Sequence, residues 1–209
     1  MKKALITAFD PFGGETINPA LEAVMALPNE IDGIKIIKLE LPTVYIKSID
    51  TVISALESEC PDILIMVGQA GGRPNVTLER VAINIDDATI PDNEGKRHSD
   101  TPIVEGGPVA YFSTLPIKDI IKALHKNEIP AAISDSAGTF VCNHVSYGAL
   151  HYAAKYLPML KAGFVHIPFA PKQTLNKPKM PSMSKETVVQ GLEVIVTAVV
   201  SFSYRNPLP

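Results

Sequence analysis

The sequence contains no tryptophan and only two cysteines among its 209 residues, and neither sign of charge dominates it. Two cysteines, Cys60 and Cys142, are too few for the class of small secreted domains that depend on several disulfides. The 19 Lys and Arg residues nearly balance the 22 Asp and Glu residues, so the chain has no long-range attraction to nucleic acid or to an anionic membrane. We therefore expect neither nucleic acid nor a membrane among its partners.

Apolar runs of membrane-spanning length are also missing. The chain begins with Lys2 and Lys3 followed by apolar residues, as a signal peptide does, but the run stops at Asp10 and no small-residue cleavage site follows. We interpret residues 4–9 as a first strand. The protein is accordingly expected in the cytoplasm, where its two cysteines need not form a disulfide.

Segments of strand length alternate with segments of helical periodicity along most of the chain, of which 46% is hydrophobic. The predicted strands are residues 4–9, 34–41, 62–68, 131–134 and 162–168, and the predicted helices are residues 20–27, 42–60, 116–127, 141–156 and 184–203. Residues 62–68 are apolar at consecutive positions, which is typical of a strand buried on both faces between helices. The chain is therefore predicted to form one domain, residues 1–209, of the α/β class with a wound, mostly parallel sheet.

The segment between residues 69 and 107 is the least regular part of the chain. Residues 76–84 are β-prone, and a polar loop follows. A long excursion inside a compact domain is more often functional or interface-forming than idle, so we expect it to help build a site with short strands of its own. Residues 171–181 are predicted to be a surface loop and residues 205–209 a frayed tail.

Cys142 is the strongest candidate for a reactive side chain. It follows the strand 131–134 and the small-residue turn 135–138, and it lies at the expected start of a helix. The partial positive charge of a helix N-terminus stabilises an anion, which lowers a thiol pKa, and the same N–H groups could hold an oxyanion. The residue type alone favours a buried structural cysteine instead. Cys60, which ends a helix just before Pro61, is interpreted as structural.

A thiol needs a base near neutral pH, and imidazole is the usual one. Wound sheets bind ligands at the carboxyl ends of their strands, so residues 9–14, 69–73, 135–142 and 166–168 are expected to meet at one edge. Of the five histidines, His166 is the one that ends a buried strand at this edge. A histidine in an apolar strand is more often a hydrogen-bonded core residue, and only the nearby Cys142 loop favours catalysis. The carboxylate that would orient the imidazole stays open among Glu79, Asp86, Asp92 and Asp135.

Three blocks of sequence resemble the pyroglutamyl peptidase I family of cysteine peptidases, also called pyrrolidone-carboxylate peptidases. The blocks are residues 9–14, residues 68–73 running on to 78–84, and residues 136–143, and residues 90–95 and 163–168 match as well. The resemblance covers nearly the whole chain. It implies Cys142 as nucleophile, His166 as base and Glu79 as the carboxylate that orients it, in a single α/β/α domain with a mixed, mostly parallel sheet that assembles as a homotetramer.

The resemblance also implies a reaction. Such an enzyme removes an N-terminal pyroglutamyl residue from a peptide through a thioester on Cys142, and it requires no metal or organic cofactor. A pyroglutamyl lactam has no α-ammonium group, so its pocket needs apolar walls and a few hydrogen-bonding groups rather than an acidic anchor. The residues expected to bind it are Phe9, Phe12, Gln69, Ile90 and Val141.

One position departs from the family pattern, because Thr89 stands where the family usually has arginine before Ile90. Any role of that guanidinium must be absent or supplied elsewhere, and Arg73 and Arg80 are the nearby candidates. A nucleoside- or phosphate-binding enzyme of similar fold is the alternative function, with glycine pairs at residues 13–14 or 71–72 cradling an anion, although neither matches a P-loop or dinucleotide pattern. A third possibility is a non-catalytic assembly module.

Overall fold

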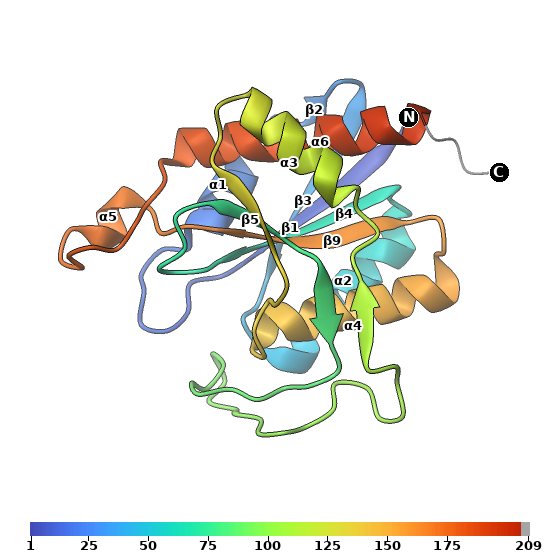
Figure 1. Cartoon of the computed structure of the whole chain (residues 1–209). Helices are drawn as coiled ribbons and strands as arrows, with labels where there is room; N and C mark the ends of the chain where they lie inside the picture. Colours follow the sequence, from blue (N-terminus) through green and yellow to red (C-terminus); the bar gives the residue numbers. More distant parts are fainter. Residues whose placement is uncertain (206–209) are drawn as a thin grey trace.

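The structure is a computed structural model and describes residues 1–205, so residues 206–209 of the predicted tail lie outside it. A seven-stranded sheet in the order β2-β3-β1-β4-β9-β5-β8 forms its centre (Figure 1). Its strands are β1 (Lys3–Phe9), β2 (Glu30–Ile31), β3 (Ile34–Leu41), β4 (Ile63–Gln69), β5 (Val76–Glu79), β8 (Ala131–Ser134) and β9 (Lys161–Ile167). Among the described residues, no helix is both long and apolar enough to cross a membrane.

Helices cover both faces of this sheet, as the apolar run at residues 62–68 predicts. The helices are α1 (Pro19–Ala26), α2 (Tyr45–Glu59), α3 (Ile117–Lys126), α4 (Val141–Tyr156), the short α5 (Pro171–Thr174) and α6 (Lys185–Arg205). The α1, α3 and α6 helices lie on one face, and α2 and α4 lie on the other (Figure 1). Within β1, Ala4 and Ile6 pack in the first of these two cores, whereas Leu5 and Phe9 pack in the second. The predicted fold class is confirmed.

The strands of the sheet do not all run in one direction. β1, β3, β4 and β9 are parallel, whereas β5 is antiparallel to β9 and parallel to β8. The prediction that residues 135–142 reach the shared edge directly from a parallel strand is therefore wrong. Residues 9–14, 69–73 and 166–168 follow parallel strands to a shared edge, but residues 135–140 leave a strand of opposite direction and must turn back to reach α4. An apolar strand pattern carries no information about direction.

The β-prone residues 76–84 divide between two sheets. β5 joins the main sheet, whereas β6 (Val81–Ile83) pairs with β7 (Ala110–Phe112) in a separate two-stranded sheet. The chain between β6 and β7 is mostly irregular, and side chains hold it together. The Asn84 amide donates to the backbone oxygen of Val104 at 2.8 Å and accepts from its N–H at 2.9 Å. The prediction of an irregular excursion with short strands of its own is confirmed.

Most predicted elements have the observed bounds to within a few residues, and β3 and α4 match theirs. The α2 helix begins at Tyr45 rather than at residue 42, and the Asp92 carboxylate accepts the Tyr45 N–H at 3.3 Å. A carboxylate at a helix N-terminus satisfies a free donor and complements the helix dipole. Because Asp92 comes from a distant loop, local sequence did not reveal this start.

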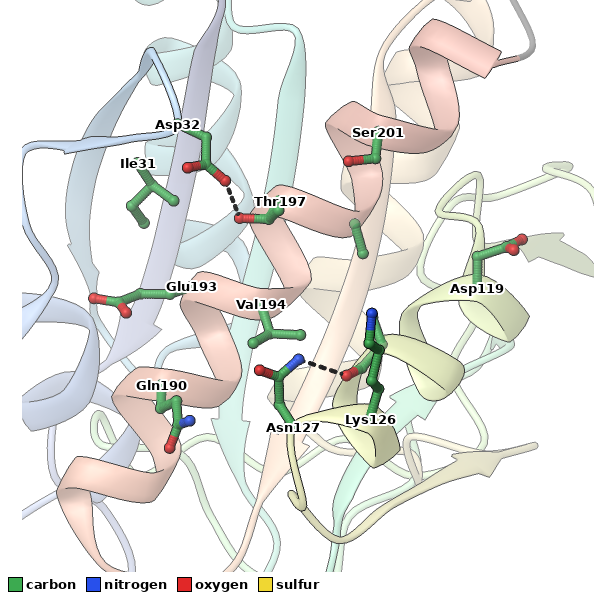
Figure 2. A pocket seen from close by; sticks show the side chains of 12 residues that line it. Ile31, Asp32, Asp119, Lys126, Asn127, Gln190, Glu193, Val194, Thr197 and Ser201 are labelled. Carbon is green, nitrogen blue, oxygen red and sulfur yellow. Dashed lines mark hydrogen bonds between the residues drawn. The ribbon is translucent and has the colours of Figure 1, made fainter.

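A cavity of about 900 Å³ lies between α3, α6 and the turn that joins β2 to β3 (Figure 2). Polar side chains such as Asp32 and Glu193 line much of it, and the Thr197 hydroxyl donates to Asp32 at 2.6 Å. None of the site residues predicted from the sequence lines this cavity. Except for Ile90, which lies in the chain between β6 and β7, they lie around the ends of β1, β4, β5 and β9 and the start of α4.

Candidate active site

Cys142 is the second residue of α4, so the prediction that it stands at a helix start is confirmed. Phe140 occupies the N-cap position in an extended conformation. Its ring has no atom that can accept a hydrogen bond from the N–H groups of the first turn, which leaves them available to an anion. The start of α4 can therefore stabilise negative charge beside the Cys142 sulfur.

The Cys142 sulfur lies directly against Gly68 in β4. A Cβ atom added to Gly68 would be 3.1 Å from the sulfur and 2.9 Å from the ring of Phe164. Gly68 is aligned with His166 in the neighbouring strand β9, and the rings of Phe164 and His166 are 4.7 Å apart. Because Phe164 and His166 are two residues apart in one strand, they lie on the same face of the sheet. Cys142 and His166 are therefore brought to the same face, at the same end of the sheet.

His166 contacts Glu79, and both side chains are buried. The Nδ1 atom of the imidazole is 2.7 Å from Oε1 of Glu79, and the two residues are 4% and 2% exposed. The contact crosses the antiparallel junction of β9 and β5. Since Nδ1 is held by the carboxylate, Nε2 is the ring nitrogen that can exchange a proton with another group.

The remaining candidate carboxylates have other partners. Asp86 lies against His144 at 2.6 Å, and Asp92 accepts N–H groups of α2 and of its own loop. Asp135 is exposed and pairs with Arg80 at 3.2 Å. Glu79 is therefore the only one of these candidates that contacts His166. Residue types and spacing left this choice open, because it depends on which strand lies beside β9.

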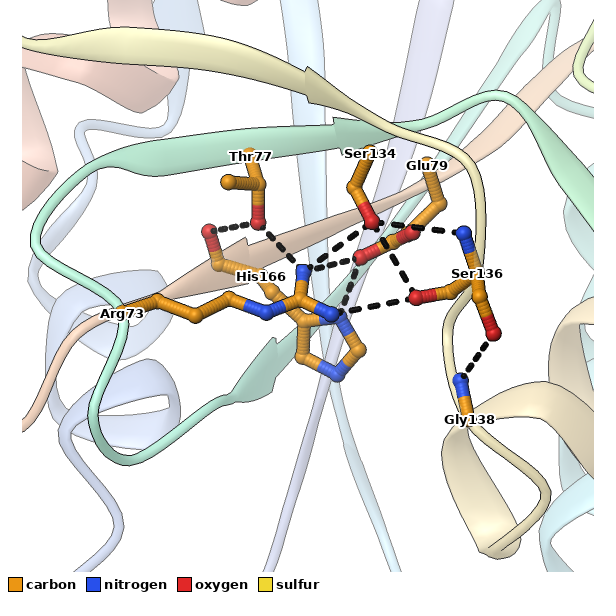
Figure 3. A network of polar contacts seen from close by, with 7 residues as sticks. All are labelled: Arg73, Thr77, Glu79, Ser134, Ser136, Gly138 and His166. Atoms are coloured by element: carbon orange, nitrogen blue, oxygen red, sulfur yellow. Dashed lines mark hydrogen bonds and ion pairs between the residues drawn. The ribbon is translucent and has the colours of Figure 1, made fainter.

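A guanidinium binds the same carboxylate oxygen as His166. The Nη1 atom of Arg73 donates to Oε1 of Glu79 at 2.6 Å (Figure 3). The same guanidinium also donates to Thr77 Oγ1, Ser134 Oγ and the backbone oxygen of Ser136. This network joins the loop after β4 to β5 and to the end of β8.

Burial controls the proton affinities of the site. It raises the pKa of the Cys142 thiol to about 12, helped by the negative charge of Glu79, while Arg73 and a backbone N–H act in the opposite direction. The predicted lowering by the helix N-terminus is therefore outweighed. Burial also lowers the pKa of His166, against the opposing effect of Glu79.

Glu79 is different, because its contacts outweigh its burial. Burial acts to raise the pKa of Glu79, but hydrogen bonds, led by the one from His166, hold that pKa below its ordinary value. Near neutral pH the site therefore holds a neutral thiol, a neutral imidazole and an ionised carboxylate. A thiolate at Cys142 therefore requires a group that accepts its proton.

The residues predicted to bind the lactam have different environments. Phe9 and Val141 are 2% and 0% exposed and pack in the core beneath the site. Phe12 and Gln69 are half-buried, and Ile90 is exposed. The Gln69 side chain accepts a hydrogen bond from Gln173 at 2.9 Å.

Phe140 is a pocket candidate that the sequence analysis missed. Its half-buried ring lies 6.3 Å from the ring of Phe12, so two aromatic side chains from distant loops meet beside the start of α4. An aromatic residue two positions before Cys142 was the available signal. The pairing with Phe12 could not be inferred from the sequence, since it depends on how residues 135–140 return to the site.

A second buried imidazole–carboxylate pair supports Phe140. His144 Nδ1 is 2.6 Å from Oδ2 of Asp86, and His98 Nδ1 is 3.9 Å from the same oxygen. The Tyr45 ring packs against both imidazoles, with centroid distances of 5.1 Å to His144 and 4.5 Å to His98. Its ring also packs edge-on against Phe140 at 5.7 Å. This cluster braces the residue at the N-cap of α4.

The two arginines considered as substitutes near Thr89 are both engaged. Arg73 binds Glu79, and Arg80 pairs with the exposed Asp135. Thr89 itself is exposed. Arg80 is therefore not part of the site, and Arg73 acts on the carboxylate.

Cys60 is exposed, so it does not fill the core as its interpretation as a structural residue implies. It forms the C-cap of α2 in a left-handed conformation with φ of 47°. The apolar pattern before Pro61 locates the helix end but not its exposure.

The glycine pairs have structural explanations that need no bound anion. Gly13 and Gly14 have φ values of 63° and 82°, which side chains rarely adopt. A Cβ atom at Gly71 would be 2.2 Å from the ring of Phe169, so packing requires glycine there. Among residues 1–205, no three His, Cys, Asp or Glu side chains are grouped so that they could hold a metal ion.

Comparisons with known proteins agree on one family. Residues 2–202 match the family model described as pyroglutamyl peptidase. The chain is 54% identical over 202 residues to a pyrrolidone-carboxylate peptidase of Treponema denticola, covering 95% of this chain and 93% of that protein. It is 52% identical over 206 residues to one of Streptococcus pyogenes, covering 99% and 96%.

Solved structures show the same similarity. A crystal structure of pyroglutamyl peptidase I from Bacillus amyloliquefaciens aligns with a TM-score of 0.92 at 46% identity, covering 95% of this chain and 94% of that one. A variant of pyrrolidone carboxyl peptidase from Pyrococcus furiosus aligns with a TM-score of 0.92 at 42% identity, covering 96% and 99%. The alternative of a nucleoside- or phosphate-binding enzyme receives no support from these matches.

Proposed function

The chain belongs to the pyroglutamyl peptidase family and is a hydrolase that removes N-terminal pyroglutamate from peptides, and from this premise we propose that Cys142, His166 and Glu79 carry out the reaction. Cys142 is the nucleophile, His166 is the general base and acid, and Glu79 orients the imidazole. The observation that carries this proposal is the Glu79–His166 contact of 2.7 Å on the same face of the sheet as the Cys142 sulfur.

The reaction is an acyl transfer in two stages. His166 Nε2 takes the thiol proton of Cys142 as the sulfur attacks the carbonyl carbon that links pyroglutamate to the next residue. The N–H groups of the first turn of α4 stabilise the oxyanion. His166 then gives the proton to the leaving amine, and the C–N bond breaks to leave a thioester on Cys142.

Hydrolysis of the thioester completes the cycle. His166 removes a proton from water as the water oxygen attacks the thioester carbonyl. The C–S bond then breaks, free pyroglutamic acid is released, and His166 returns the proton to the Cys142 sulfur. Glu79 stays ionised throughout, holds the imidazole by Nδ1 and stabilises the imidazolium at each stage. A neutral resting pair suits this cycle, because the sulfur acquires its charge only when His166 can receive the proton.

We propose that the lactam ring binds beside the start of α4. Phe12 and Ile90 would contact the ring, Gln69 would hydrogen-bond its amide, and Phe9 and Val141 would shape the floor from beneath. The contact between Phe12 and Phe140 supports an apolar wall at this place. An apolar wall fits a substrate whose N-terminal group carries no charge.

Cleavage of a pyroglutamyl-linked fluorogenic amide tests the proposed nucleophile. Cys142→Ser should lose nearly all turnover and keep its thermal stability, because a hydroxyl is a far weaker nucleophile at neutral pH. Cys60→Ser is the matched control and should behave as wild type, since Cys60 is exposed at the end of α2. Retained turnover in Cys142→Ser would contradict the mechanism.

We also propose how the whole protein is organised, assembled and located. The family resemblance supports a single catalytic domain over residues 1–209, a homotetramer and a cytoplasmic location. Light scattering on the purified protein and fractionation of cells test the last two.

A further inference from the structure

Arg73 makes several polar contacts within the site, although its side chain is only partly buried. Its guanidinium binds Glu79 on β5 at 2.6 Å and Thr77 on the same strand at 2.8 Å (Figure 3). It also binds Ser134 Oγ at the end of β8 at 3.3 Å and the backbone oxygen of Ser136, just after β8, at 3.0 Å. Its side chain is 32% exposed, whereas the Glu79 side chain is 2% exposed. The arginine therefore covers the carboxylate on the solvent side.

The two donors to Glu79 use one oxygen. Oε1 accepts from Arg73 and contacts Nδ1 of His166, whereas Oε2 is buried and has no hydrogen-bond partner among the described residues. With a single oxygen anchored, rotation of the carboxylate would exchange the oxygen that faces His166. The Arg73 contact opposes this rotation, because it too needs the oxygen in its present place.

We propose that Arg73 is a positioning residue for the reaction, which holds the Glu79 carboxylate toward His166 and balances its buried charge. This inference rests on the proposed roles of Glu79, His166 and Cys142. Arginine suits the task because its planar fork can reach the carboxylate, two hydroxyls and a carbonyl at once, whereas a lysine ammonium acts as a single compact charge.

The charge of Arg73 acts on every titrating group of the site in a known direction. It lowers the pKa of the Cys142 thiol and the pKa of His166, and its hydrogen bond lowers that of Glu79. Glu79 alone would leave a buried negative charge that disfavours a thiolate. Arg73 therefore offsets part of the repulsion between Glu79 and the sulfur.

Few other charged side chains lie near His166, Glu79 and Cys142. His166 and Glu79 face each other from β9 and β5, and Cys142 faces them from α4. Glu15 pairs with Lys177 beyond Gln69. Arg80 and Asp135 neutralise each other on the surface near the end of β8. Arg73 is thus the cation bound to the carboxylate itself.

The test measures kcat, KM and the pH profile of Cys142 alkylation by iodoacetamide. Arg73→Met should lower kcat by up to about 100-fold with a smaller change in KM, as expected for a misplaced catalytic group. The pH profile of alkylation has two limbs, one set by the imidazolium of His166 and one by the Cys142 thiol. Both limbs should move to higher pH in Arg73→Met, because losing the positive charge raises the pKa of each group. Glu79→Gln should move both limbs in the opposite direction, because it removes a negative charge.

Matched variants separate positioning from general stability. Arg80→Met removes the same charge from the surface pair and should leave kcat and the pH profile as in wild type. Arg73→Lys keeps the charge without the fork, so its profile should stay near that of wild type while kcat still falls. If Arg73→Met does not fold, Arg73→Lys decides, and an unchanged kcat in that variant overturns the proposal.

A double variant shows whether Arg73 works through Glu79. In a Glu79→Gln background, Arg73→Met should lower kcat little further, because the carboxylate that Arg73 positions is already gone. Additive losses, or a folded Arg73→Met with wild-type pH limbs, would overturn the inference. If Glu79→Gln alone retains wild-type kcat and wild-type limbs, the proposed role of Glu79 fails instead, so the two failures are distinguishable.

Discussion

The sulfur of Cys142 lies 3.1 Å from the position that a Cβ atom on Gly68 would take. This distance is shorter than ordinary van der Waals contact, so a methyl group at Gly68 must displace the sulfur or the Phe164 ring. The relation between these two residues sets how closely α4 approaches the sheet. It also sets where the Cys142 sulfur stands relative to His166 on the adjacent strand.

Gly68→Ala should therefore impair catalysis more than folding. We expect kcat to fall by up to about 100-fold, because small displacements of a reacting atom are costly. The free energy of unfolding should fall by about 1–3 kcal/mol, as for other overpacked sites. Steady-state kinetics and urea denaturation measure the two effects. Gly191→Ala is the control, because its Cβ would meet neighbours at 3.7 Å or more and should not change kcat.

Glu79→Gln should lower kcat far more than it raises KM, because the amide keeps the size of the side chain but cannot support the imidazolium. The loss is expected to reach up to roughly 10⁴-fold, the size seen when a triad carboxylate becomes an amide. The pH profile of Cys142 alkylation should move to lower pH, because the negative charge of Glu79 no longer raises the pKa of the thiol. Asp135→Asn, which alters an exposed carboxylate, should match wild type. If the Asp135 variant were the impaired one, the assignment of Glu79 would be wrong.

Pyroglutamyl amides should be strongly preferred to prolyl and glutaminyl amides. Both competitors carry a charged amine that an apolar slot would desolvate without a counter-charge, which costs several kcal/mol. The comparison is kcat/KM for the three amides on wild type and on Phe12→Ala. Selective loss of pyroglutamyl turnover in Phe12→Ala would place that ring in the wall, whereas comparable prolyl and pyroglutamyl rates on wild type would refute the lactam pocket.

Asp86→Asn should weaken substrate binding through Phe140. The change removes the charge that His144 and His98 share beneath Tyr45, and the buried imidazole loses its strong partner. We expect a loss of about 1–3 kcal/mol in the free energy of unfolding and a rise in KM that exceeds any fall in kcat. The neighbouring Asp87→Asn alters an exposed side chain and serves as control. A normal KM in a destabilised Asp86 variant would show that the cluster does not control Phe140.

Much of this fold follows from periodicity along the chain. Residues 34–41 and 141–156 are predicted with their observed bounds because their patterns are local. Strand direction is not local, which is why the return of residues 135–140 was not foreseen. The positions of Cys142 at a helix start and of His166 at a strand end could be predicted, because they depend on local patterns.

Side-chain contacts that depend on the tertiary fold could not be predicted from the sequence. The Arg73–Glu79 pair depends on how the loop between β4 and β5 lies along β5, and the pairing of Phe12 with Phe140 joins residues far apart in sequence. The balance of pKa effects at Cys142 was also mispredicted, because a helix start is visible in the sequence and the degree of burial is not. The positions of the candidate site residues could thus be predicted better than their pKa values.

The strand order has a consequence for the newly made chain. In the described part of the protein, β9 lies between β4 and β5 and joins the strand that carries Gly68 to the strand that carries Glu79. It is also the last strand of the sheet to leave the ribosome, 87 residues after the carboxylate that His166 contacts. A nascent chain that has not reached β9 lacks His166 and the strand that pairs with both β4 and β5. In the proposed mechanism such a chain cannot cleave peptides, because the base that accepts the Cys142 proton is not yet made.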